Sequence, residues 1–224
     1  MLSQRLVINS IFLLILISFK GLCDDLYKKP ANIILSYIPH PQVQAYVDLI
    51  KSVYEDDLGI KVTLHSTPAH RGLIMLNSGV TDADVIRIGT NAATFDNLVV
   101  IEPQLEIGEL LLVCRLDVTC SLDVLADPNI VVMSNIGNEM TLKELNIKAN
   151  VLLHENIETV LEFMHKRQIV YGIYASTKDI RQTVQKDFNA IKLKDVGLNH
   201  VIHKKHSALI PELTSSIKKR LKDL

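Results

Sequence analysis

The stretch PAHRGLIMLNSGVTDADVIRIG, residues 68–89, predicts a helix followed by a short buried strand. Pro68 suits the first turn of a helix, and the sequence NSG at residues 77–79 is typical of a helix end. The apolar run ADVIRI, residues 83–88, then predicts a strand. Arg87 lies inside this run, and a buried guanidinium is costly unless an acceptor pairs with it. The partner of Arg87 is therefore the first question that the sequence poses.

The same alternation of strands and helices extends toward the N-terminus. A strand is predicted at NIILSYI (32–38), a helix at VQAYVDLIKSVYEDDLG (43–59) and a strand at IKVTLH (60–65). Together with residues 68–89, these segments give a β-α-β-α-β order with short connections. Such an order is typical of parallel strands that are covered by helices.

A second alternating block follows further along the chain. Strands are predicted at 97–102 and 108–114, and the second of these leads away from the first block. The second block contains predicted strands at 129–134, 149–154 and 169–176, helices at 142–147, 156–168 and 177–188, and a final strand and helix at 200–205 and 207–224. Because the two blocks are separated near residues 103–112, the sequence predicts two α/β lobes.

Residues 1–23, MLSQRLVINSIFLLILISFKGLC, have the layout of a secretory signal. Arg5 precedes an apolar stretch that is too short to span a bilayer comfortably, and small residues stand at Gly21 and Cys23. We therefore expect cleavage after Cys23 and export to the periplasm. Lipidation of Cys23 and an uncleaved N-terminal anchor are the alternatives.

Export changes the interpretation of the two remaining cysteines. Cys114 and Cys120, in CRLDVTC, can form a disulfide that closes a small local loop in an oxidising compartment. The alternative is a pair of free thiols in the core. We predict no metal site, because no histidine lies near these cysteines. His200, His203 and His206 straddle a predicted strand and a turn, and no carboxylate or thiol is spaced to complete a metal set.

The composition is that of an ordinary globular protein without a nucleic-acid-binding signal. Hydrophobic residues make up 48% of the chain, charged residues 22%, and the formal net charge is −1. A chain without Trp and with 5% aromatic residues offers neither a basic surface nor a stacking platform for nucleic acid. The sequence contains no G-x-S-x-G, H-E-x-x-H or P-loop motif, so we predict neither an enzyme nor a cofactor.

Several segments, taken in order, resemble the periplasmic solute-binding proteins of family 3, the bilobed amino-acid-binding type. These segments are VQAYVDLIKSVYEDDLGIKVTL, PAHRGLIMLNSGVTDADVIRI, IVVMSNIGNEMTLKEL, ETVLEFMHKRQIVYGIYAS and HKKHSALIPEL. The resemblance covers essentially the whole mature chain. It implies the type II periplasmic binding protein fold, an α/β fold of two lobes, each a mostly parallel sheet flanked by helices, joined by two crossover strands. Lobe one would comprise residues 24–104 and 190–224, and lobe two residues 105–189, after a signal peptide at 1–23.

Two departures from the family pattern concern the ligand. Typical members carry a Thr and an Arg after the third strand that clamp the α-carboxylate of the ligand, whereas GTNAATFDNLV (89–99) has no arginine. Members often end the strand that corresponds to IVYGIYAS (169–176) with an acidic residue that binds the ligand's amino group. Here Ala175 and Ser176 stand at that end. Both departures weaken the case for a free α-amino acid as the ligand.

Arg87 and Arg71 are the candidate cations for an anionic ligand. Arg87 lies near the end of a strand, where ligand crevices open, and its guanidinium can bind a carboxylate or phosphate through two hydrogen bonds. By strand alternation, Arg87 and Asp84 point to opposite faces. The alternative is an internal ion pair of Arg87 with Asp82, Asp84 or Asp96. Arg71 lies on the first turn of its helix, where the positive helix end also favours an anion, unless it is a solvated surface arginine.

Four further residues are candidate ligand contacts. Tyr37 ends the first strand, where its ring can cover a ligand, unless it is a rim residue. Gly137, Asn138 and Thr141 form a loop before a helix, and free backbone N–H groups there suit a carboxylate. Routine helix capping by Asn138 or Thr141 is the alternative.

The sequence therefore predicts a periplasmic protein that captures a small anionic or zwitterionic, amino-acid-like solute by lobe closure. We expect it to act as a monomer and to serve an ABC permease or a membrane sensor. An alternative from another class is a ligand-less accessory or signalling module that binds a protein through the same fold. A third is an enzyme on this scaffold, as in lytic transglycosylases, whose accessory domains share it.

Overall fold

The computed structural model describes residues 27–222. The predicted signal peptide lies outside these residues, so its cleavage site stays a prediction. The compact unit begins at Ala31, and all the elements named below belong to it. Among the described residues, no helix has the length and apolar character that crossing a membrane requires.

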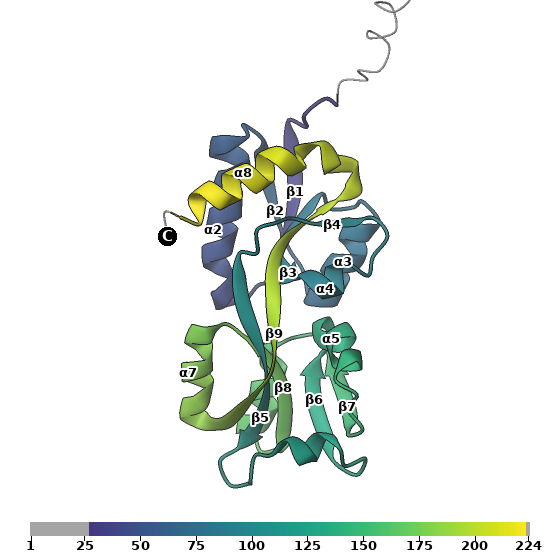
Figure 1. The fold of residues 1–224 in the computed structure, drawn as a ribbon, viewed down its shortest axis with the longest axis vertical. Coiled ribbons are helices and arrows are strands. Elements are labelled where there is room, and N and C mark those ends of the chain that lie inside the picture. Colours follow the sequence, from purple (N-terminus) through teal and green to yellow (C-terminus); the bar gives the residue numbers. More distant parts are fainter. Residues whose placement is uncertain (1–26, 223–224) are drawn as a thin grey trace, which may run out of the picture. The chain divides into compact units, whose positions relative to one another are not determined.

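Lobe one is built on three parallel strands. β1 (Asn32–Tyr37) pairs with β2 (Lys61–Ser66) on one side and with β3 (Ala83–Ile88) on the other. Helices α2 (Gln44–Ser52) and α3 (Ala69–Asn77) connect these strands, as Figure 1 shows. Each of these elements overlaps the segment in which the sequence predicts it.

The predicted helix at 43–59 changes character in its last part. Val53–Asp57 forms a π-helical turn, and Gly59 then takes a positive φ of 68°. Glycine adopts this conformation at little cost, so it ends the helix and turns the chain into β2. The C-terminal helix α8 (Ile210–Arg220) packs on the same turn, where Arg220 Nε donates to Asp57 Oδ2 over 2.6 Å.

Lobe two contains the second alternating block. β6 (Val131–Asn135) pairs in parallel with β7 (Asn150–His154) and with β8 (Tyr171–Ser176). Its helices are α5 (Glu139–Glu144), α6 (Glu158–His165) and α7 (Lys178–Asp187). The parallel strands are again separated by helices, as the alternating pattern predicts.

Two long antiparallel strands connect the lobes. β5 (Glu106–Arg115) pairs along its whole length with β9 (Phe188–His203), and both run from one lobe into the other (Figure 1). β9 also pairs with β3 and with the short β4 (Leu98–Val100), while β5 also pairs with β8. The described residues thus form a nine-stranded sheet in the order β2-β1-β3-β9-β5-β8-β6-β7, with β4 beside β9. The predicted fold class is confirmed.

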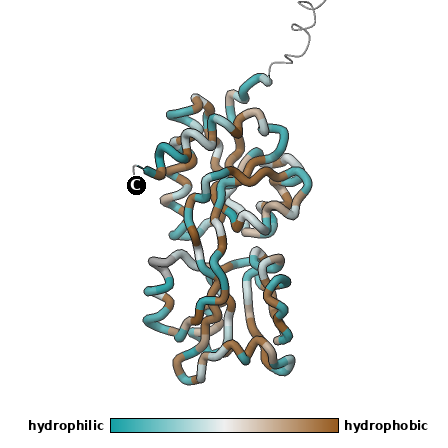
Figure 2. Tube along the Cα trace, in the orientation of Figure 1, coloured by the Kyte–Doolittle hydropathy of each residue, from teal (hydrophilic) through white to brown (hydrophobic). Residues whose placement is uncertain are grey.

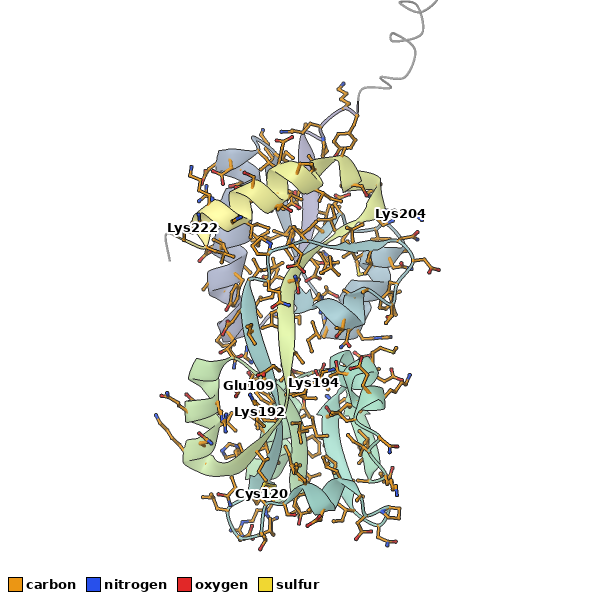
Figure 3. All side chains as sticks on the ribbon, viewed as in Figure 1. Glu109, Cys120, Lys192, Lys194, Lys204 and Lys222 are labelled. Atoms are coloured by element: carbon orange, nitrogen blue, oxygen red, sulfur yellow. A yellow bond between two sulfur atoms is a disulfide. The ribbon has the colours of Figure 1, made fainter. Side chains whose placement is uncertain are left out.

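β9 is longer than the sequence pattern indicates. The pattern predicts a strand only at 200–205, whereas β9 already begins at Phe188. Charged residues interrupt the apolar pattern in its first half, and Figure 3 shows Lys192 and Lys194 where the strands cross between the lobes. Lys192 Nζ lies 3.1 Å from a carboxylate oxygen of Asp195 and 3.8 Å from one of Glu109. The lysine side chains form ion pairs, while the backbone of β9 continues to hydrogen-bond with β5. A strand can therefore form here although its sequence is polar.

Each lobe has an apolar core of its own. In lobe one, Leu35 of β1 and Ile217 of α8 are fully buried in the same cluster. In lobe two, β5 alternates between two clusters, because Leu110 and Leu111 point to opposite faces of the sheet. Figure 2 shows hydrophobic residues gathered along the strands and more hydrophilic ones along the helices.

Cys114 and Cys120 form a disulfide bond, which is the pairing that the sequence predicts. The S–S distance is 2.07 Å and the two Cα atoms lie 5.6 Å apart. The bond joins the end of β5 to the following turn, and Figure 3 shows Cys120 at the far end of lobe two.

The three histidines of HVIHKKH have separate partners. His200 is fully buried and both of its ring nitrogens are hydrogen-bonded. His203 accepts a backbone N–H of the turn that follows β9, and His206 lies 2.9 Å from Asp82. Each ring therefore has a structural contact of its own in lobe one.

Candidate functional site

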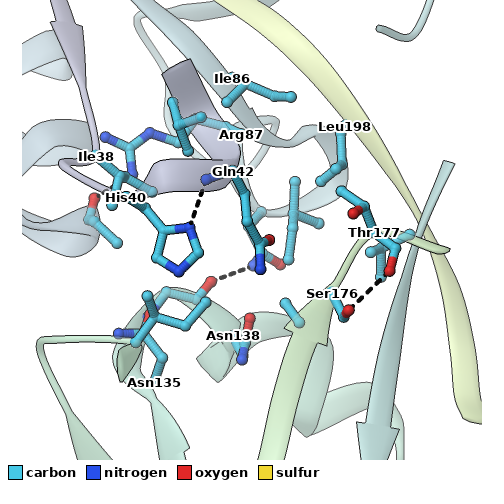
Figure 4. Close-up of a pocket in the computed structure, with 18 of the residues that line it drawn as sticks. Ile38, His40, Gln42, Ile86, Arg87, Asn135, Asn138, Ser176, Thr177 and Leu198 are labelled. Atoms are coloured by element: carbon cyan, nitrogen blue, oxygen red, sulfur yellow. Dashed lines mark hydrogen bonds between the residues drawn. The ribbon is translucent and has the colours of Figure 1, made fainter. Parts of the chain in front are cut away.

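A pocket lies between the two lobes, and Figure 4 shows it at close range. Its cavity volume is about 120 Å³. Lobe one contributes the segment after β1, the first turns of α2 and α3, the end of β3 and the short helix α4 (Gly89–Ala92). Lobe two contributes the loop after β6 and the end of β8, and β9 runs along the wall. The pocket thus lies where strand ends of both lobes meet, as in other open α/β sheets.

The pocket wall is mainly apolar. Its aliphatic side chains come from both lobes and from β9: Ile38, Val43, Leu73, Ile86, Ile88, Ile157, Val196 and Leu198. Among the described lining residues, the ionisable side chains are His40, Tyr46 and Arg87, and no carboxylate is present. The chemistry of the pocket therefore depends on how the few polar groups are already paired.

Arg87 lines the pocket but is bound to its own lobe. Its Nη2 lies 2.5 Å from Oδ2 of Asp84, and its Nη1 donates to the carbonyl of Ala69 over 2.9 Å. Arg87 is 5% exposed and Asp84 is fully buried. Ser36 donates a second hydrogen bond of 2.6 Å to the same carboxylate oxygen. Arg87 Nε and Asp84 Oδ1 have no hydrogen-bond partner among the described residues. The pair answers the question posed by the sequence: the partner of Arg87 is Asp84.

A β-bulge brings these two side chains to the same side of β3. Asp84 pairs with Val201 and Arg87 with Asn199, so two residues of β3 oppose the single residue His200. The extra residue breaks the strict alternation that places positions 84 and 87 on opposite faces. Gly72 of α3 makes room for the guanidinium, because a Cβ at this position would overlap Arg87 Nη2.

Arg71 and Tyr37 lie outside the pocket lining. Arg71 is exposed on α3 and does not line the pocket. Tyr37 is half-buried at the end of β1, where it packs against the apolar core of lobe one. A role of either residue in ligand binding stays a prediction.

The loop after β6 reaches the pocket through two of the three residues predicted there. Gly137 and Asn138 line the cavity, whereas Thr141 lies on the next turn and is fully buried. Asn135 caps the turn by accepting the Gly137 N–H over 2.7 Å, and Asn138 Nδ2 donates to Ser134 Oγ over 3.3 Å. The capping residue is therefore Asn135, not Asn138 or Thr141.

Asn91 joins the two lobes directly. Its Nδ2 donates to the carbonyl of Gly137 over 2.5 Å, and its Oδ1 accepts from the hydroxyl of Thr141 over 2.8 Å. Asn91 lines the pocket and is 4% exposed. Asn91 is not among the residues predicted from the sequence, in which the segment GTNAATFDNLV is notable for its missing arginine. Its position directly after a strand end was the available signal.

A second set of contacts joins the lobes near His40. Nδ1 of His40 accepts the Gln42 backbone N–H over 3.2 Å, so its Nε2 carries the proton that faces the carboxylate of Glu158 on lobe two. The side chain of Gln42 also hydrogen-bonds the hydroxyl of Tyr174, which belongs to β8. Burial raises the pKa of Tyr174, and the charge of Glu158 raises it further. The lobes are thus in direct contact at two places beside the pocket.

At the end of β8, the side chains are neutral. Ala175, Ser176 and Thr177 line the pocket where the family pattern often has an acidic residue. Ser176 Oγ donates to the Thr177 carbonyl over 2.8 Å, so its hydroxyl proton is already used (Figure 4). Nothing in this strand end would bind a ligand ammonium group through a carboxylate.

No protein-family model matches the sequence, and no curated protein matches it significantly. Comparison of folds, in contrast, finds solved structures that cover most of the chain. The ancestral amino acid-binding protein AncCDT-1, a precursor of cyclohexadienyl dehydratase, matches with a TM-score of 0.72 and 15% identity over 86% of this chain and 91% of its own. The fold is that of the bilobed amino-acid-binding proteins.

Two further structures with the bilobed fold cover similar shares. The GluR0 ligand-binding core from Nostoc punctiforme, solved with L-glutamate, has a TM-score of 0.70 at 14% identity and covers 85% of this chain and 93% of its own. A putative L-cystine ABC transporter protein from Listeria monocytogenes has a TM-score of 0.72 at 12% identity, with 86% and 91% covered. At identities this low, similarity of structure establishes the fold and nothing further. The fold implied by the sequence resemblance is confirmed.

Proposed function

We propose that this protein captures a small solute between its two lobes and performs no covalent chemistry on it. The observation that carries this proposal is the pocket, whose walls come from both lobes and from the crossover strand β9. A pocket divided in this way is completed only when the lobes come together, so binding and lobe closure are coupled. Proteins with the same fold that are named for amino-acid binding support a solute-binding role.

The proposal also covers the setting in which the protein acts. Export to the periplasm and delivery of the solute to an ABC permease or a membrane sensor remain part of the proposal. The putative L-cystine ABC transporter protein supports the first of these partners, because it has the same fold. The proposal includes no catalytic step, although one similar structure is named as the precursor of a dehydratase.

The predicted ligand is anionic or zwitterionic, and the pocket restricts how such a ligand would bind. Arg87 is the one Arg or Lys among the described lining residues, and it already pairs with Asp84. A carboxylate would therefore have to share or displace Asp84, and a ligand ammonium group would find no lining carboxylate. The charge of the ligand is consequently the property that most needs a test.

A thermal-shift screen tests solute capture. The purified protein is heated with amino acids, small carboxylates, neutral amides and peptides, and a bound solute raises the melting temperature by mass action. Ala175→Leu fills the pocket and should abolish the shift, whereas Ala45→Leu, on the exposed side of α2, should preserve it. Solute capture in this pocket is contradicted if both variants respond equally or if no solute shifts the folded protein.

A second candidate function is a ligand-less module that binds a protein partner. It is favoured by the direct contacts of Asn91 with Gly137 and Thr141, which join the lobes through protein groups alone. Under this alternative, every solute would fail in the thermal-shift screen, and Ala175→Leu would leave binding to the protein partner unchanged.

A further inference from the structure

We infer that the pocket selects a small, neutral and mainly apolar solute, and that Asp84 sets this preference by neutralising Arg87. The inference rests on the proposed function, because it names the class of solute that the same pocket takes. It differs from the anionic or zwitterionic ligand that the sequence suggests.

The charge balance of the pocket is the first argument. Arg87 and Asp84 are both buried and are joined over 2.5 Å, so together they carry no net charge. The carboxylate of Glu158, which faces His40, places a further negative charge beside the pocket. A solute anion would add one uncompensated negative charge to a mainly apolar enclosure, where charge is poorly solvated. A neutral solute leaves the existing balance unchanged.

The fold of β3 and its neighbours holds Asp84 in the position where it neutralises the charge of Arg87. The bulge in β3 turns Asp84 to the side of Arg87, and Ser36 of the neighbouring strand donates to the same carboxylate. The backbone carbonyl of Asp84 also accepts a hydrogen bond of 2.8 Å from buried His200. Because three elements hold Asp84 in place, it is not free to leave Arg87 when a solute enters.

The polar groups of the wall are the second argument. Asn135 donates twice through its side-chain amide and accepts through its oxygen, and Asn91 donates once and accepts once, all within the protein. The hydroxyl proton of Ser176 is also used, and the remaining wall is largely aliphatic. Nε of Arg87 is a lining donor without a partner among the described residues, so it can serve one solute oxygen. A highly polar solute would still lose the hydration of its other polar groups, which costs free energy. The wall therefore matches a solute with few polar groups.

The size of the cavity limits the solute further. Its volume is about 120 Å³, which is somewhat less than the ~150 Å³ of an apolar cavity that binds benzene. Figure 4 shows this space bounded by Arg87 and Ile86 on one side, Asn135 and Asn138 on another, and Leu198 of β9. A mainly aliphatic solute of about the size of benzene or less, with one small polar group, fits these limits.

Matched solutes of one skeleton separate charge from size. Three triplets each contain an amide, the corresponding carboxylate and the corresponding amino acid: propionamide, propionate and L-alanine; isovaleramide, isovalerate and L-valine; 4-methylpentanamide, 4-methylpentanoate and L-leucine. Each is titrated into the protein by calorimetry at neutral pH. We expect an amide to bind at least about tenfold more tightly than its carboxylate and amino acid, because the latter bring uncompensated charges.

The outcomes distinguish this inference from the proposed function. If a carboxylate or amino acid binds as tightly as its amide, or more tightly, the inference is wrong while solute capture stands. If no member of any triplet binds, solute capture in this pocket is wrong, and the inference fails with it.

Asp84→Asn tests the role assigned to Asp84. The variant leaves the charge of Arg87 uncompensated, so the preference should reverse, with isovalerate binding at least about tenfold more tightly than isovaleramide. Circular dichroism shows whether the variant folds. A folded variant with unchanged preference would overturn the role of Asp84. If the variant does not fold, Ser36→Ala removes the second hydrogen bond to Asp84 and should narrow the preference for the amide; an unchanged preference would again overturn that role.

Discussion

Asn91 of lobe one and Thr141 of lobe two share a hydrogen bond of 2.8 Å, in which the threonine hydroxyl donates to the asparagine side-chain oxygen. The amide of Asn91 donates in turn to the carbonyl of Gly137. One side chain thus joins the lobes beside the pocket. Under the proposed capture of a solute, both bonds would break when the lobes open and re-form when they close.

Thr141→Val should loosen the closed arrangement. Valine keeps the shape of the side chain but leaves Oδ1 of buried Asn91 without its donor, which costs about 1–3 kcal/mol. We expect a lower free energy of unfolding in urea and faster amide exchange in the loop at 135–138. Thr90→Val is the matched control, since Thr90 is exposed. Equal behaviour of the two variants would show that the bond contributes nothing to closure.

Gly72→Ala should destabilise the protein although alanine favours a helix by about 1 kcal/mol. The new Cβ would overlap Nη2 of Arg87, which is fixed by Asp84 and by the carbonyl of Ala69. We expect a net loss of about 1–3 kcal/mol in urea unfolding. In an Arg87→Met background the overlap disappears, so the same substitution should be neutral or stabilising. A loss of equal size in both backgrounds would mean that Arg87 is not the group that requires glycine.

The stability of the protein should fall in mild acid because of His200. Nδ1 of His200 donates to the Asp84 carbonyl and Nε2 accepts from the Tyr54 hydroxyl, each over 2.8 Å, so the buried ring is neutral. Burial lowers the pKa of His200 from 6.5 to about 4. Between these two values the unfolded chain binds one more proton than the folded one, so falling pH favours unfolding.

Substitution of His200 can show whether this residue causes the loss of stability in mild acid. The stabilisation is complete above pH 6.5 and is lost as the pH falls toward about 4, with the folding constant changing up to about tenfold per pH unit. Urea unfolding measured across this range should show a flatter pH dependence in His200→Gln. His65→Gln, at an exposed position, should keep the slope of the natural protein. A slope that survives in His200→Gln would point to other groups.

Loss of the disulfide should lower stability without affecting solute binding. The Cys114–Cys120 bond closes a loop with a sequence separation of 6, and a loop this short contributes about 2 kcal/mol. Cys120→Ser and chemical reduction should each lower the free energy of unfolding by that amount. The affinity for any solute should remain unchanged, because neither cysteine lines the pocket. A change in affinity would reveal coupling between this loop and the pocket.

Much of the fold follows from local sequence patterns. The strands at β1, β3, β6 and β8 are short apolar runs bounded by turn residues, and such runs predict buried strands. The first half of β9 does not follow from such patterns, because Lys192 and Lys194 interrupt its apolar run while its backbone still pairs with β5. Pairing over a long distance in sequence leaves no local signal in such a strand.

The site was harder to predict than the fold. Strand alternation places Asp84 and Arg87 on opposite faces, and only the bulge, which depends on pairing with the distant β9, brings them together. Asn91 acts through Gly137 and Thr141 of the other lobe, contacts that are visible only once both lobes are folded. Gly137 and Asn138 could be selected because they follow a strand end directly.

The most direct test of solute capture is a crystal structure of the protein grown with the solute that gives the largest thermal shift. Capture between the lobes predicts density for the solute in the pocket, in contact with Ile86 of lobe one, Asn138 of lobe two and Leu198 of β9. Density for the solute outside this pocket, with the pocket itself empty and the lobes still joined through Asn91, would contradict it.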